Sequence, residues 1–371
     1  MKITSVQTYH VEHRLPRAMG GATAFYRTRD TVLVKISTDE GLVGWGETAA
    51  LAGARALIEE QLGPMLIGAD PLEHRRLWRR LWGMNFGNGL AVGALDLALH
   101  DLRGKALQRS LADLYGGRLR DRVPAYASAV CYVEMVEPEK NYPEEALTLV
   151  ERGFRALKMR IGGLPARRDL AAVAKVREAV GPNVRLMADG NGAYSLATAI
   201  EVGRELERLG LYWFEEPLPQ PHYAGYEVLT ATLDIAIAGG EVLDSRGAFH
   251  EVINRRAMDI VQPDISLCGG FAECLFVAEM ARLWGILCVP HCYAGAILHA
   301  ATLQLLSLLP DASWARTTET PMLELDVGEN PFRDRLAYQP FQVREGLVEV
   351  PTGPGLGIDI DEDLIRHHEV H

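Results

Sequence analysis

The sequence predicts an α/β protein in which a barrel of alternating strands and helices follows a smaller α+β unit. From residue 123 onward, short apolar runs alternate with stretches whose apolar residues recur three and four positions apart, as helices covering a parallel sheet require. Eight such runs indicate a (β/α)8 barrel, and no GxGxxG follows the first run to favour a dinucleotide-binding sheet. The predicted strands are residues 123–128, 155–160, 184–189, 211–216, 235–241, 259–264, 286–291 and 314–319.

Residues 1–122 have a different pattern, with three alternating strands, a turn at "TDEGL" and then three helical stretches. We therefore expect an α+β unit at 1–122, the barrel at 123–339 and a C-terminal segment at 340–371. That last segment has strand and turn character, and we expect it to return to the N-terminal unit. The glycine-rich segment 14–28 lies between two strands and is predicted to be a mobile flap.

Composition limits the classes of partner. A net charge of −11 disfavours nucleic acid and anionic membranes, and no apolar run approaches the roughly 20 residues of a membrane helix. The N-terminus lacks the apolar centre of a signal peptide. The five cysteines include no CxxC pair, which makes structural zinc improbable and fits a reducing, cytoplasmic location.

Ionisable residues stand at the ends of seven successive predicted strands, about one barrel unit apart. Barrel enzymes carry their chemistry at the carboxyl ends of the strands, so these side chains should share one rim. A solvated rim explains a single charged strand end, but not seven in succession. The residues are Lys158, Arg160, Asp189, Glu215, Glu241, Asp264, His291 and Glu319.

Three of these residues form a predicted metal site. Asp189, Glu215 and Glu241 end adjacent strands, and three converging carboxylates repel one another unless a cation lies between them. An all-oxygen ligand set suits Mg2+, with Mn2+ as the near alternative. The competing interpretation is that each carboxylate pairs with a nearby lysine or arginine.

The remaining strand ends predict proton transfer. Asp264 can orient His291 as a general acid or base. Lys158 and Arg160 lie on one face of a strand, so their repulsion should lower the pKa of Lys158, and the pair can hold a carboxylate. Glu319 could donate a proton. Bases on two sides of a metal suit abstraction of a proton α to a carboxylate, with the metal stabilising the enediolate.

The stretches "KMR", "MADGN", "WFEEP", "GGE", "VQPDIS", "VPHC" and "VPTGPGLGID" resemble the mandelate racemase subgroup of the enolase superfamily along essentially the whole chain. The resemblance implies a modified, (β/α)7β-type barrel and an α+β capping domain completed by the C-terminal tail. It places Mg2+ on the three carboxylates and matches Asp264 and His291 to a His-Asp dyad. It assigns an electrophile to Glu319, with Glu324 as the competing candidate.

The same resemblance implies substrate contacts and a class of substrate. Asn191 matches a position that touches substrate, and segments 14–28 and 47–55 match the capping loops that set specificity. Several segments are similar to the members that act on acid sugars, which implies a small carboxylate substrate, and the family's symmetric assemblies imply a homo-oligomer, often an octamer.

One position departs from the lysine-lysine pattern of the subgroup, in which the second lysine is the base. Here Arg160 stands second, and a guanidinium with a pKa above about 12 offers little base at neutral pH. The leading hypothesis is therefore dehydration of an acid sugar to a 2-keto-3-deoxy acid, with Arg160 binding substrate. The alternatives are a racemase, epimerase or lactone cycloisomerase, and, from another class, a non-catalytic metal-binding barrel.

Overall fold

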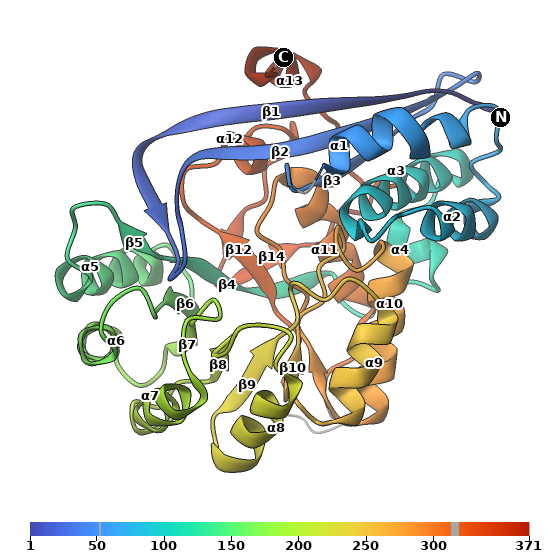
Figure 1. Cartoon of the computed structure of the whole chain (residues 1–371). Coiled ribbons are helices and arrows are strands. Elements are labelled where there is room, and N and C mark those ends of the chain that lie inside the picture. Colours follow the sequence, from blue (N-terminus) through green and yellow to red (C-terminus); the bar gives the residue numbers. More distant parts are fainter. Residues whose placement is uncertain (52, 313–318, 371) are drawn as a thin grey trace.

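The computed structural model describes residues 1–51, 53–312 and 319–370. Its first part is an antiparallel sheet in the order β3-β2-β1-β5, whose long strands β1 and β2 run across the top of the molecule (Figure 1). The strands are β1 (Ile3–Gly20), β2 (Phe25–Thr38), β3 (Val43–Thr48) and β5 (Tyr132–Val133), and the helices are α1 (Ala54–Leu57), a π turn (Ile58–Leu62), a 3-10 turn (Pro64–Leu66), α2 (His74–Gly83), α3 (Gly89–Leu107) and α4 (Leu111–Leu114).

The helix α3 packs directly on β3 because the strand carries glycine at the contact. A Cβ atom at Gly44 would lie 2.2 Å from the carbonyl oxygen of Ala98, and one at Gly46 would lie 2.0 Å from that of Ala94. These distances leave no room for any side chain. The "GWG" triplet therefore lets the backbone of α3 lie on the sheet.

The second part is a barrel of parallel strands, in the order β12-β4-β6-β7-β8-β9-β10-β11 within the described residues. Only the four-residue α12 (Pro331–Asp334) follows β12 directly, so the expected (β/α)7β architecture is confirmed. The strands are β4 (Arg122–Val130), β6 (Ala156–Arg160), β7 (Arg185–Asp189), β8 (Trp213–Glu215), β9 (Ala236–Gly239), β10 (Ile260–Val261), β11 (Leu287–Cys288) and β12 (Leu323–Asp326), and the helices between them are α5 (Pro138–Glu151), α6 (Ala166–Val180), α7 (Leu196–Arg208), α8 (Tyr223–Thr232), α9 (Arg246–Asn254), α10 (Phe271–Leu283) and α11 (Ala296–Leu308).

The eighth barrel strand is not the one predicted at 314–319. Residues 313–318 lie outside the described part of the chain, and the strand that pairs with β4 is β12, with Glu324 opposite Tyr126. Glu319 is exposed and lies in the loop before β12. The β-branched and aromatic residues of "WARTTE" are typical of a strand. The acidic residues at alternate positions of "LELD" are not, so the sequence gives little indication of β12.

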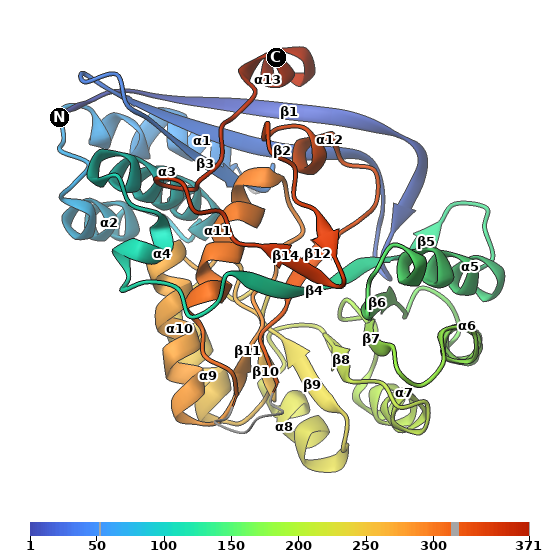
Figure 2. The ribbon, with the colours of Figure 1, turned by 180° about the vertical axis from the view of Figure 1, so that it is seen from behind.

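The C-terminal segment contacts both parts of the molecule. The hairpin of β13 (Val343–Arg344) and β14 (Leu347–Glu349) adds antiparallel to β4, as Figure 2 shows from behind. Helix α13 (Glu362–His368) then reaches β1, where the backbone N–H of Val370 donates to the carbonyl of His10. The tail therefore completes the capping domain, as expected, and also adds to the barrel sheet, which the sequence did not predict.

The predicted flap at 14–28 is mostly strand. β1 continues to Gly20 and β2 begins at Phe25, with a bulge between Arg14 and Met19. Gly20 also pairs with Tyr132 of β5, which follows the first barrel strand. The segment is therefore the tip of a hairpin, and backbone hydrogen bonds join it to the barrel.

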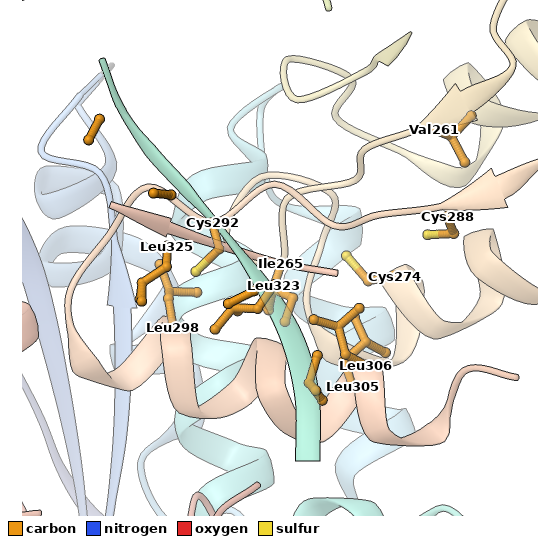
Figure 3. Packing of buried hydrophobic residues seen from close by; sticks show 14 of the residues in the cluster. Val261, Ile265, Cys274, Cys288, Cys292, Leu298, Leu305, Leu306, Leu323 and Leu325 are labelled. Carbon is orange, nitrogen blue, oxygen red and sulfur yellow. The ribbon is translucent and has the colours of Figure 1, made fainter. Parts of the chain in front are cut away.

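Two apolar layers support the barrel. Inside it, Tyr126, Met187, Trp213 and neighbouring residues form a buried cluster below the strand ends. Outside it, Leu323 and Leu325 of β12 pack with Leu298, Leu305 and Cys292 around α11 (Figure 3). All five cysteines are free and buried, and no helix of the described residues is long and apolar enough to cross a membrane.

Two buried carboxylates of the capping domain bond to the starts of barrel helices. Glu47 accepts hydrogen bonds from the backbone N–H groups of Gly295 and Leu298, at 2.6 and 3.0 Å, where α11 begins. Asp96 accepts from the N–H of Phe271 at the start of α10. A helix N-terminus attracts negative charge, so both contacts hold the domains together.

Asp96 also belongs to a buried polar network. His74 Nε2 lies 2.8 Å from one oxygen of Asp96, and His100 Nδ1 lies 3.2 Å from the other. His100 Nε2 is 2.6 Å from the hydroxyl of Tyr115. Because hydrogen bonds engage these donors and acceptors, the network is structural in this conformation.

We expect Glu47→Ala to lower the free energy of unfolding by about 2–3 kcal/mol, because it leaves N–H groups at the start of α11 buried without acceptors. The measurement is urea-induced unfolding followed by tryptophan fluorescence. The exposed Glu60 is the matched control, and Glu60→Ala should change stability by less than about 0.5 kcal/mol. Equal unfolding midpoints for the two variants would contradict the assignment.

Candidate active site

Three carboxylates converge at the carboxyl ends of neighbouring strands. Asp189 ends β7, Glu215 ends β8 and Glu241 follows β9 by two residues. Each offers one oxygen, and these oxygens all lie within 4.8 Å of one another. Asp189 and Glu215 are fully buried, and the buried Oε2 of Glu241 has no hydrogen-bond partner. The donor set and this free oxygen fit a hard divalent cation.

Lys158 and Arg160 project from β6 onto these carboxylates. Lys158 Nζ lies 2.5 Å from Glu215 Oε1 and 3.5 Å from Asp189 Oδ2, and Arg160 Nη1 pairs with Asp189 Oδ2. The strand pairing aligns Arg160, Asp189 and Glu215 side by side. The expectation that both cations face a carboxylate site is therefore met in the structure.

The expected shift of the Lys158 pKa is wrong in direction. Burial lowers this pKa, and so does Arg160, but the charges of Glu215, Glu324 and Asp189 together raise it above its usual value. Three carboxylates outweigh one guanidinium. Lys158 is consequently a protonated ion-pair partner here, and a divalent cation on the same carboxylates would weaken that attraction.

His291 and Asp264 meet as predicted. His291 Nδ1 lies 2.7 Å from Asp264 Oδ2, while the backbone N–H and the hydroxyl of Ser266 donate to Asp264 Oδ1 at 2.7 and 2.5 Å. The other ring nitrogen, Nε2, lies 3.5 Å from Glu241 Oε2. Burial lowers the pKa of His291, but Glu241, Glu324 and Asp264 outweigh burial and raise it to about 10.

Glu324, the competing candidate for the electrophile, lies between Lys158 and His291. Its Oε1 is 2.7 Å from Lys158 Nζ and its Oε2 is 3.8 Å from His291 Nε2. Burial raises the pKa of Glu324, but Lys158, His291 and Arg160 outweigh burial and lower it. Glu319 is exposed outside this group, so its predicted place at the end of the eighth strand is wrong, since that strand is β12.

Asn191 lies where the capping hairpin meets the barrel. Its backbone N–H donates to Asp189 Oδ1 at 2.9 Å, and its buried side-chain Oδ1 has no hydrogen-bond partner. A Cβ at Gly21 of the hairpin would lie 2.2 Å from that oxygen and 3.9 Å from Arg160 Cδ. The tip of the hairpin therefore covers the ends of β6 and β7.

Several supporting residues were not predicted from the sequence. Trp213 Nε1 and Gln262 Nε2 donate to Glu215 Oε2 at 2.9 and 3.0 Å. Burial and the charges of Glu241 and Asp189 raise the pKa of Glu216 to about 9. Alternation along a strand indicates Trp213 and Gln262, which stand two residues before Glu215 and Asp264, whereas it places Glu216 on the other face from Glu215.

A rim of buried carboxylates, two cations and a His-Asp pair on a (β/α)7β barrel defines a class of metal-assisted enzymes that act on carboxylates. Comparison with family models places the chain within this class. Residues 3–116 match the mandelate racemase / muconate lactonizing enzyme N-terminal domain, and residues 141–364 match the enolase C-terminal domain-like family. The chain belongs to the mandelate racemase and muconate lactonizing enzyme group of the enolase superfamily, and it is an enzyme of that type.

Its relatives include enzymes named for acid sugars and their lactones. D-galactarolactone cycloisomerase of Agrobacterium fabrum is 36% identical and covers 98% of each chain. Arabinonate dehydratase of Saccharolobus solfataricus is 32% identical over 92% of this chain and 91% of its own. The structure of 3,6-anhydro-D-galactonate cycloisomerase from Zobellia galactanivorans covers 100% of both chains at 32% identity, with a TM-score of 0.89.

Members of this superfamily bind magnesium. A racemase from Streptomyces coelicolor A3(2), which is 25% identical and has a TM-score of 0.88 over 99% of this chain and 100% of its own, has a structure with bound magnesium. The three converging carboxylates of this chain suit the same kind of ion.

We expect Glu241→Gln to weaken Mn2+ binding by about tenfold or more, because it removes one of three anionic ligands. Electron paramagnetic resonance of free Mn2+ during titration measures this directly, without a substrate. The exposed Glu319 offers the matched control, and Glu319→Gln should bind as the wild type does. Unchanged affinity in Glu241→Gln would exclude this residue as a ligand.

Proposed function

We propose that the protein is a Mg2+-dependent dehydratase, with Mn2+ as a substitute ion, that converts an acid sugar to a 2-keto-3-deoxy acid. The observation that carries this proposal is the asymmetry of the bases. On one side His291 presents Nε2 to the carboxylate cluster, backed by Asp264. On the other side Lys158 is paired with carboxylates and the second position is Arg160. Racemisation by two bases requires a second competent base, whereas dehydration does not.

Each residue has a proposed role in this reaction. Asp189, Glu215 and Glu241 hold the ion, and Arg160 and Asn191 bind the substrate. A bound ion would supply positive charge beside the substrate carboxylate. As a ligand of that ion, Glu241 would attract the proton of His291 less strongly, and the pKa of His291 would fall. Neutral His291, oriented by Asp264, removes the α-proton. The resulting imidazolium then returns a proton to the departing β-hydroxyl.

Glu324 and Lys158 act on the substrate carboxylate in this proposal. Glu324 lies between Lys158 Nζ and His291 Nε2, whose charges lower its pKa. A substrate carboxylate bound beside it would raise that pKa, and the protonated acid would then donate a hydrogen bond to the oxygens on which charge develops. Lys158 supplies positive charge to the same oxygens. We assign the role of electrophile to Glu324 in place of Glu319.

An isomerase is the second candidate. After the same removal of an α-proton, reprotonation of the α-carbon yields an epimer. Cleavage of the bond between the β-carbon and the ring oxygen, with that oxygen kept in the molecule, yields an isomer of a lactone. The identity with a D-galactarolactone cycloisomerase favours the lactone cycloisomerase among these reactions. A racemase is less well supported because Arg160 replaces the second lysine.

The proposal extends to organisation and location. We propose that residues 1–122 form the capping domain, 123–339 the barrel and 340–371 the segment that joins them. Five free, buried cysteines fit a reducing cytoplasm. We further propose a homo-oligomer whose partners include neither nucleic acid nor membranes, in keeping with a net charge of −11.

Proton NMR in D2O with Mg2+ and a panel of mono- and diacid sugars tests the reaction. The wild type should form a 2-keto-3-deoxy acid, and His291→Asn should lose about 10²–10⁴-fold in rate because it lacks a proton-transfer group. Glu319→Gln should remain fully active. Exchange of the α-proton without a keto product would indicate an isomerase, and an unaffected His291→Asn would exclude His291 from the chemistry.

Replacement of Arg160 by lysine tests whether residue 160 can transfer a proton on the side of the site opposite His291. An ammonium deprotonates more readily than a guanidinium, so Arg160→Lys should add a base opposite His291. The expected result is new exchange of the α-proton with deuterium on the lysine face, visible as epimerised substrate. Loss of substrate binding without new exchange of the α-proton would show that Arg160 only binds the substrate.

A further inference from the structure

Two tyrosines meet across the seam between the capping hairpin and the barrel. Tyr26 belongs to β2 of the capping sheet, and Tyr293 follows His291 by two residues. Their hydroxyl oxygens lie 2.7 Å apart, so one hydroxyl donates to the other. The pair still has one O–H donor and several acceptor lone pairs available for a further partner.

A buried ion pair holds both rings in position. The guanidinium carbon of Arg29 lies 4.9 Å from the ring centre of Tyr26 and 4.8 Å from that of Tyr293. Arg29 is only 6% exposed, and its Nη2 lies 3.2 Å from Asp326 Oδ2. Its Nε also donates to the carbonyl oxygen of Glu329. The arginine is thus a positioning residue, and Asp326 neutralises its charge.

The tyrosine pair adjoins the catalytic group. The guanidinium of Arg160 lies 5.7 Å from the ring centre of Tyr293, and it also pairs with Asp189 of the carboxylate cluster. Asp326 lies two residues after Glu324 on β12, so both side chains face the inside of the barrel. Arg160 therefore links the carboxylate cluster to the tyrosine pair, so a substrate bound by Arg160 would extend toward the two hydroxyls.

We infer that Tyr26 and Tyr293 are specificity-determining residues that bind an uncharged hydroxyl at the far end of the substrate. This inference rests on the proposed function and narrows its substrate class to monocarboxylic acid sugars, such as aldonates, in preference to the dicarboxylic aldarates. Two neutral phenols suit a hydroxyl, since each can donate and accept.

Among the described residues, the two cations beside this pair, Arg29 and Arg160, are already paired with Asp326 and Asp189. Arg29 is committed to Asp326, and both tyrosine rings lie against its guanidinium. Burial raises the pKa of Tyr26 and of Tyr293, so both phenols stay protonated and neutral near pH 7. An unpaired carboxylate enclosed here would lose its hydration without a compensating charge.

The test compares substrates that differ only at the far end. For six-carbon aldonates, their 6-deoxy counterparts and the matching aldarates, kcat and KM are measured with Mg2+ for the wild type, Tyr26→Phe and Tyr293→Phe. Tyr338 is 62% exposed, and Tyr338→Phe is the matched control for loss of a phenolic hydroxyl. Thermal melting verifies that every variant is folded.

We expect the wild type to prefer aldonates over aldarates by about 100-fold or more in kcat/KM, since an unpaired buried charge is costly. For the wild type, kcat/KM on the 6-deoxy substrate should be about tenfold lower than on the aldonate, mainly because KM is higher. Either tyrosine variant should largely lose this discrimination, while Tyr338→Phe should keep it.

A preference of the wild type for aldarates would overturn the inference. So would tyrosine variants that lose activity equally on the hydroxyl and deoxy substrates, because the phenols would then serve packing alone. Both results leave the proposed dehydration intact. Absence of turnover of any acid sugar by the wild type is a different result, which would refute the proposed function and this inference with it.

Discussion

Mutual repulsion between buried carboxylates is the constraint on which the site depends. Asp189, Glu215, Glu241 and Glu324 gather at one end of the barrel, above the apolar cluster that lies below the strand ends. Burial raises the pKa of Glu215 and Lys158 lowers it, but the charges of Asp189, Glu324 and Glu241 add to burial, so the pKa is raised to about 7. Lys158 and Arg160 offset the negative charge of these carboxylates, and a bound divalent cation would add further positive charge. The cations that we propose to contact the substrate are therefore also those that offset the charge of the buried candidate metal ligands.

Much of this site could be predicted from the sequence because barrel geometry is periodic. Parallel strands about one unit apart bring their carboxyl ends to one rim, so Asp189, Glu215 and Glu241 could be grouped without coordinates. The same rule paired Asp264 with His291. These predictions depend only on the register of strands and the alternation of side chains.

The predictions that were wrong or missing concern residues whose contacts come from distant parts of the sequence. Lys158 has Arg160 as its nearest charged neighbour in the chain, but Glu215 and Glu324 decide its pKa. Glu319 and Glu324 both follow plausible strand patterns, and only pairing with β4 separates them. Tyr26 and Tyr293 are 267 residues apart, and no periodicity relates a capping hairpin to a barrel loop. Tertiary packing decided each of these cases.

The contact between the two ends of the chain has a consequence for biosynthesis. Glu369 bridges to Val11 of β1, Val370 donates to His10, and Lys35 of β2 pairs with Glu362. Strand β1 is translated long before residues 362–370, and it gains these partners only once those residues have left the ribosome. Until then β1 presents unpaired backbone groups on this side. A chain that lacks residues 362–370 would therefore leave these backbone groups of β1 open to pairing with other chains, which favours aggregation.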